Sequence, residues 1–175
     1  TWNCYKRCEA EVICTKDAAV LVLAHGSVEN VKFFWNKILK KKENFDLEMQ
    51  KEILSSKKLL LSTARYSNSD SLKFIFGSYE KVFGETCDEI LSKLIDERDE
   101  NNNNLLHLAC RHNSSHVVEL IWGKIEKILK NDKEKLKKFL ELKGEDGKTI
   151  QELAAENQYK FNKEEIQNYF KKILS

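Results

Sequence analysis

Apolar and polar residues follow one another along this chain in a pattern that occurs four times, at intervals of 41, 46 and 45 residues. The segments that align are LVLAHGSVENVKFFW from Leu21, LSTARYSNSDSLKFIF from Leu61, HLACRHNSSHVVELIW from His107 and QELAAENQYKF from Gln151. Each has a short apolar stretch before a turn position, and in the first three an amphipathic stretch of helical period follows. The pattern predicts a helix, a turn and a second helix in each unit, as in a repeat solenoid.

The turn positions fall at Gly26, Ser67, Asn113 and Gln158, of which the first three are residue types that accept tight or left-handed backbone. The second helices are predicted to be long, with the sequences FFWNKILKKK, FIFGSYEKVF and IWGKIEKIL. A small amphipathic segment follows each of them: LEMQKEIL, CDEILSKLI and EKLKKFLEL. We expect these inserts to be short helices that belong to the repeat.

The third and fourth units carry the most specific motifs. The third has LHLA from Leu106 and VVELI from Val117, and the fourth has DGKT from Asp146 and LAA from Leu153. On these residues the chain resembles the ankyrin repeat family, whose units have a DxxGxT loop, a TPLHLAA helix start and a VVxxLL second helix. A plain ankyrin repeat has about 33 residues, so the inserts account for the longer units here.

The first two units match this family less well. Leu60 and Leu61 stand at the polar and histidine positions of the second unit, and Leu105 and Ile150 replace the family's proline. The resemblance implies an all-α, ankyrin-type helical solenoid with extended second helices and short inserted helices. We expect four units, at residues 18–57, 58–103, 104–148 and 149–175, preceded at residues 1–17 by an N-terminal helix or cap, or the remnant of a further repeat.

The resemblance also implies a function, because ankyrin-type stacks bind proteins on their concave face and loops. Near its end, each first helix has a small or aliphatic residue, and these are Leu23, Ala64, Cys110 and Ala155. In members of the family, the two residues that follow this small-residue position point to the concave face. Here they are Ala24, His25, Arg65, Tyr66, Arg111, His112, Glu156 and Asn157. The loops at residues 96–104 and 143–148 would add Asn102, Asn104 and Asp146. Arginine and tyrosine are favoured at interfaces, so we expect a protein–protein interaction module that is part of a larger protein.

Other prominent side chains are expected to be structural. Trp35, Phe76 and Trp122 occupy equivalent positions, and we interpret them as core residues of a stacked array rather than as an aromatic ligand cage. The resemblance gives His107 a structural role in hydrogen bonding to the backbone between units, although the usual threonine partner is missing.

Composition narrows the class of partner. The 175 residues include no proline and only 6 glycines, which disfavours an all-β fold, and 30 basic against 28 acidic residues leave a formal charge of +2. The basic runs at residues 37–42 and 124–138 are interrupted and are interpreted as solvated helix faces. An acidic or phosphorylated protein is therefore favoured over nucleic acid. No apolar run approaches the roughly 18 residues of a membrane span, and we expect an intracellular, cytoplasmic protein.

No combination of residues predicts catalysis, a metal site or a cofactor. The five cysteines are scattered without a CxxC pair and are expected to be reduced thiols: Cys4, Cys8, Cys14, Cys87 and Cys110. His112 and His116 have the spacing of a zinc-binding pair but lack the glutamate of HExxH. Cys110 lies three residues from His107, at a position expected to be buried, where a thiol is inert.

Two further interpretations stay open beside a simple binding module. The chain could be the substrate-recognition segment of a multidomain enzyme whose catalytic part lies elsewhere. It could also belong to a host-directed effector or toxin, a hypothesis suggested by its richness in lysine, asparagine and isoleucine.

Overall fold

The structure is a computed structural model that describes residues 16–38, 47–66, 69–112, 115–130, 132–156, 164, 166–168 and 170–171. Within these ranges the secondary structure is helical apart from turns and one antiparallel bridge between Lys143 and Thr149. The all-α class is therefore confirmed for the described residues. Residues 1–15 of the expected N-terminal cap lie outside them, as do the turn positions at residues 67, 113 and 158.

The first helix of each unit is short, as its apolar stretch predicts. These helices are α2 (Lys16–His25), α5 (Lys57–Tyr66), α8 (Leu105–His112) and α11 (Ile150–Glu156). The second helices are α3 (Val28–Phe33), continued by a π-helical turn at Phe34–Ile38, then α6 (Ser69–Phe83) and α9 (Ser115–Ile128). Ser27 caps the start of α3, since its side chain accepts a hydrogen bond from the Asn30 N–H at 3.4 Å.

All three inserts form helices, which confirms the prediction from their amphipathic pattern. They are α4 (Leu47–Leu54), α7 (Cys87–Ile95) and α10 (Lys133–Leu140). A single 3₁₀ turn at Gly84–Thr86 connects α6 to α7, and another at Glu145–Gly147 lies in the loop before α11. Asp132 caps α10 by accepting from the Lys135 N–H at 3.2 Å.

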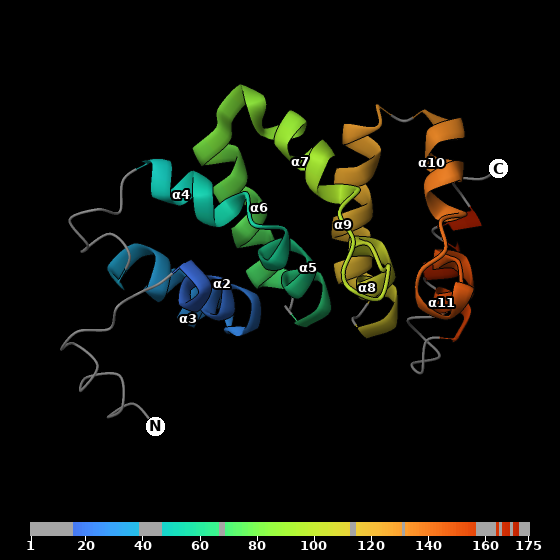
Figure 1. Cartoon of the computed structure of the whole chain (residues 1–175), viewed down its shortest axis with the longest axis horizontal. Coiled ribbons are helices and arrows are strands. Elements are labelled where there is room, and N and C mark those ends of the chain that lie inside the picture. The colour runs from blue at the N-terminus through green and yellow to red at the C-terminus, as the bar shows by residue number, and fades with distance from the viewer. Residues whose placement is uncertain are drawn as a thin grey trace.

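The helices are arranged in chain order along an elongated array (Figure 1). The first helices pack against one another in sequence, α2 on α5, α5 on α8 and α8 on α11. The second helices do the same, α3 on α6 and α6 on α9, while α7 packs against both α6 and α9. Each unit therefore contacts mainly its neighbours, which is how repeat arrays bury a continuous core.

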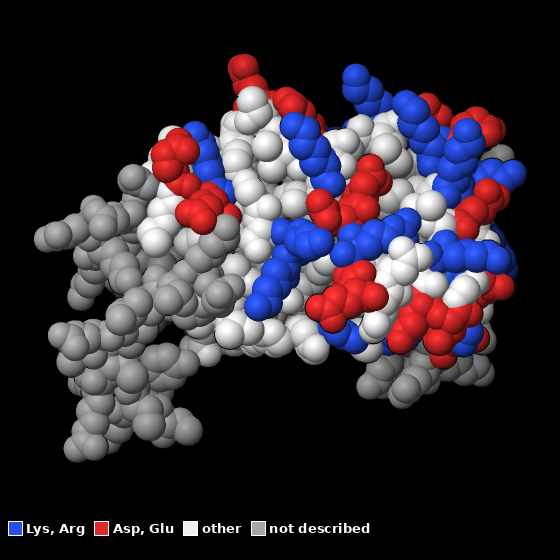
Figure 2. All heavy atoms as spheres, in the orientation of Figure 1, with Lys and Arg blue, Asp and Glu red and all other residues white. Residues whose placement is uncertain are grey.

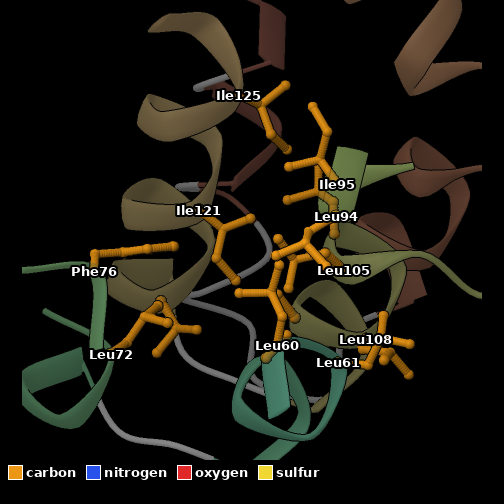
Figure 3. Close-up of a cluster of buried hydrophobic side chains, with 14 of the residues drawn as sticks. Leu60, Leu61, Leu72, Phe76, Leu94, Ile95, Leu105, Leu108, Ile121 and Ile125 are labelled. Carbon is orange, nitrogen blue, oxygen red and sulfur yellow. The ribbon is translucent and has the colours of Figure 1, made fainter. Parts of the chain in front are cut away.

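The core between the second and third units shows this arrangement in detail. Side chains from α5 to α9 meet there in one cluster (Figure 3). The labelled members are Leu60, Leu61, Leu72, Phe76, Leu94, Ile95, Leu105, Leu108, Ile121 and Ile125, all buried. Because the insert helix α7 contributes Leu94 and Ile95, the inserts are part of the core and not surface additions.

The three aromatic residues at equivalent positions are core residues, as expected. Trp35, Phe76 and Trp122 are 6%, 4% and 0% exposed. Trp35 packs edge-to-face on Phe74 of the next unit, and Trp122 does so on the buried Phe170. Their burial favours the core interpretation over an aromatic ligand cage.

Candidate protein-binding surface

The short helices end side by side, because they stack in register. The residue at the small position is buried in each of the first three, at Leu23, Ala64 and Cys110. The chain then emerges from the core, and Tyr66 is 54% exposed at the end of α5. We call the side chains that follow the small positions the helix-end strip, and its described members are His25, Arg65, Tyr66, Arg111, His112 and Glu156. Ala24 is fully buried and is not part of this surface, contrary to expectation, and Asn157 lies outside the described residues.

Four of the six described members of the helix-end strip form a continuous chain of contacts across three helices. The His25 and Tyr66 rings stack with their centroids 4.3 Å apart and their planes at 30°. The Arg65 guanidinium lies over the same tyrosine ring at 5.6 Å from its centroid. The Arg65 Nε–H donates to Nε2 of His112, at the end of α8 in the next unit, at 3.4 Å. The structure therefore brings together four of the residues that the sequence pattern selected.

The other two described members, Arg111 and Glu156, form ion pairs with the loop before α11. Arg111 donates to a Glu145 carboxylate oxygen at 2.9 Å and lies 3.7 Å from the Asp146 carboxylate. Lys148 pairs with Glu156 at 2.7 Å. Arg111, Asp146 and Glu156 thus interact within the chain, and a partner would have to compete with these contacts.

Asn104 corrects the expected loop surface. It is fully buried, and its Oδ1 accepts hydrogen bonds from the backbone N–H groups of Leu106 at 3.1 Å and His107 at 3.0 Å. It therefore caps α8 and cannot offer its side chain to a partner. An asparagine three residues before the histidine, at the start of an apolar run, is a capping signal that the sequence reasoning missed. Asn102 is exposed as expected, in left-handed backbone at φ 62°, and its amide donates to the Lys143 carbonyl at 3.1 Å.

His107 has the structural role that the resemblance implies, with Asn104 in place of threonine. It is fully buried, its Nδ1 lies 3.4 Å from the Asn104 N–H, and its Nε2 lies 3.0 Å from the Leu142 carbonyl oxygen. Nδ1 also lies 2.6 Å from the Asn104 Oδ1, and because both oxygens only accept, a neutral ring donates to one of them, either to Leu142 from Nε2 or to Asn104 from Nδ1. Burial lowers the pKa of His107 to about 4, which keeps the ring in this neutral form.

Charge over one face of the molecule is mixed rather than of one sign. Figure 2 shows lysine and arginine side chains interspersed with aspartate and glutamate over the face in view. Burial, and then the neighbouring Arg65 and Arg111, lower the pKa of His112, so neutral His112 is the form that accepts from Arg65.

Candidate nucleophiles and metal ligands give no site in the described part of the chain. Cys87 and Cys110 are buried, and burial raises the pKa of each thiol. No group of three potential metal-ligating side chains occurs among the described residues. Cys4, Cys8 and Cys14 lie outside those residues. His112 ends α8 and His116 is in the first turn of α9, so the two do not share a helix face.

An open groove of about 510 Å³ lies between α6 and α9, and sequence reasoning did not find it. Two lysines on its wall are already paired, Lys124 with Glu80 and Lys127 with Asp88. The pairing with Lys124 lowers the pKa of Glu80, in keeping with an ion pair. The wall of the groove therefore carries less unpaired positive charge than its number of lysines indicates.

Comparisons of this chain with family models, curated proteins and solved structures find no match. Among the described residues, no helix is both long and apolar enough to cross a membrane.

Proposed function

We propose that this chain is a protein–protein interaction module, an ankyrin-type scaffold within a larger protein that binds a partner protein along the helix-end strip. The observation that carries the proposal is the contact chain from His25 through Tyr66 and Arg65 to His112. It lines up exposed side chains of three stacked helices on a rigid support. Tyrosine and arginine held in this way offer large contact area with directional hydrogen bonds at little entropic cost.

The stacking order and the motifs of the last two units support the ankyrin-type part of the proposal. Each first helix packs against the first helix of a neighbouring unit, and the loops at residues 96–104 and 143–148 both lead into a first helix. Loops on a rigid scaffold are a common place for recognition, and Asn102 and Asp146 are both exposed there.

The test is affinity capture with the immobilised chain from a lysate of the cells that produce it. The informative variant is R65A/Y66A, because Arg111 supports the loop before α11 and its loss would confuse binding with structure. The control is E89A/K93A, which removes a 3.0 Å ion pair on the exposed face of α7.

We expect R65A/Y66A to lose the proteins that the wild type captures, while both variants keep wild-type far-UV helicity. The proposal fails if R65A/Y66A still captures them all, or if the wild type captures nothing above a blank matrix.

A further inference from the structure

Arg65 differs from Arg111 in having no carboxylate partner within the described ranges. Arg111 is neutralised by Glu145 and Asp146. The polar contacts of Arg65 are with His112, through Nε, and with the Tyr66 ring. Because Nε is engaged, the guanidinium is held in place, and its two terminal nitrogens have no hydrogen-bond partner among the described residues. These two nitrogens form one edge of the fork that binds a carboxylate through two hydrogen bonds.

Two further donors lie beside this edge. The Tyr66 side chain is 54% exposed, and its ring is fixed between His25 and Arg65. The His25 ring is exposed at the end of α2 and contacts Tyr66 by stacking. The strip thus adds a tyrosine hydroxyl and an imidazole to the hydrogen-bond donors of Arg65.

We propose that the part of the helix-end strip formed by His25, Arg65, Tyr66 and His112 binds an acidic peptide segment, with one aspartate or glutamate carboxylate on the terminal nitrogens of Arg65. This inference rests on the proposed function and names the chemistry of the partner.

The charges along the strip define this partner further. Next to His112, Arg111 is paired with Glu145 and Asp146 of the loop before α11, and these two carboxylates exceed its single positive charge, which disfavours a long polyanion. Nucleic acid needs several free cations in a row to release its counterions, and Arg65 is the one arginine among the described members of the strip without a carboxylate partner. A peptide with an acidic residue at the α5 end, and without an acidic run toward α11, fits the surface best.

The probe for this inference is a displayed library of random 12-residue peptides, selected on the immobilised full chain. We expect the enriched peptides to carry more aspartate or glutamate than the input library. A synthetic copy of the most enriched peptide should bind R65A at least about tenfold more weakly, since a hydrogen bond to a charged group contributes about 1.5–3 kcal/mol. The Glu→Gln or Asp→Asn version of that peptide should weaken by a similar factor on the wild type.

The R65E variant sharpens the test. Charge reversal should change the selected peptides from acidic to basic, whereas K93A on α7 should leave the selection unchanged. Circular dichroism of each variant checks that the fold is retained.

Enriched peptides without an excess of acidic residues, or no enrichment, would overturn the inference. If neutral peptides are enriched and lose binding to Y66A, the strip still binds protein and only the acidic preference is wrong. If enriched peptides bind R65A/Y66A as well as the wild type, the proposed function is wrong too.

Discussion

Helices α5 and α8 occupy equivalent places in consecutive units, yet they begin in different ways. At the start of α8, Asn104 and His107 hydrogen-bond to each other's backbone N–H groups, and His107 also contacts the Leu142 carbonyl. The equivalent of His107 in α5 is Leu61, which is 7% exposed and packs in the apolar core. One position in the repeat is therefore polar and bonded in one unit and purely apolar in the other.

The start of α11 follows the polar scheme. Thr149 and Glu152 form a capping box, in which the Thr149 N–H donates to Glu152 at 2.7 Å and the Glu152 N–H donates to Thr149 at 3.2 Å. The Asn104 and His107 pair has the same reciprocal geometry with different residues. The comparison shows that reciprocal polar contacts fix the helix starts of the last two units, while Leu61 of α5 packs in the apolar core.

The largest expected effect comes from giving α8 the residue that α5 uses. His107→Leu leaves the Leu142 carbonyl and the Asn104 N–H without partners in a buried place, and we expect a loss of about 3 kcal/mol in the free energy of unfolding. Urea denaturation at pH 7 measures it, with Leu61→Met as the control that should cost under about 1.5 kcal/mol. A His107→Leu protein as stable as the wild type would mean that the polar start is interchangeable with the apolar one.

The pH dependence of stability gives the next effect. The folded pKa of His107, about 4, lies below the ordinary value of 6.5, so its neutral form is favoured by folding. The stability that results is present above pH 6.5 and is lost as pH falls toward 4, because the unfolded chain binds the proton first. The loss should be on the order of 3 kcal/mol. Subtracting the same pH series for His107→Gln removes the contribution of the carboxylates, and a zero difference would contradict the buried neutral ring.

The periodic features of this fold could be predicted from the sequence, and the individual long-range contacts could not. The helical period predicted the first helices and the three inserts, and it placed Trp122 in the core. Its register also selected Tyr66 and Arg65, because residues just after a buried position at a helix end emerge together.

The sequence predicts Asn104 on the binding surface because exposed loops on a rigid scaffold are common places for recognition. Its burial depends on His107, which is held in turn by a carbonyl 35 residues further along the chain. The pairing of Arg111 with Glu145 across 34 residues escaped prediction for the same reason. Such contacts depend on how the units stack and leave no local signal.

Tyr79 in α6 shows the opposite difference, because at its position the second unit has a polar side chain and the third unit has an apolar one. Its hydroxyl donates to the Leu54 carbonyl at the end of α4 at 2.5 Å, and the side chain is fully buried. Burial raises the pKa of Tyr79, so it remains a donor. The equivalent residue in α9 is Ile125, also fully buried. We expect Tyr79→Phe to cost about 2 kcal/mol in urea unfolding, because the carbonyl is left unbonded.

The conservative change Ile125→Val is the matched control and should cost about 1 kcal/mol, through lost volume alone. If Tyr79→Phe costs no more than this, the hydrogen bond does not hold α4 to α6.

The smallest effect concerns Thr63, which stands where α8 has the buried Ala109. Thr63 is fully buried, and its hydroxyl has no hydrogen-bond partner in the described part of the chain. Thr63→Val replaces the hydroxyl by a methyl group of similar shape, so we expect the free energy of unfolding to rise by about 1 kcal/mol. Thr63→Ser keeps the hydroxyl and removes the methyl group, and it should lower stability instead. A Thr63→Val protein less stable than the wild type would show that the hydroxyl is bonded, and that α5 has a polar contact of its own as α8 does.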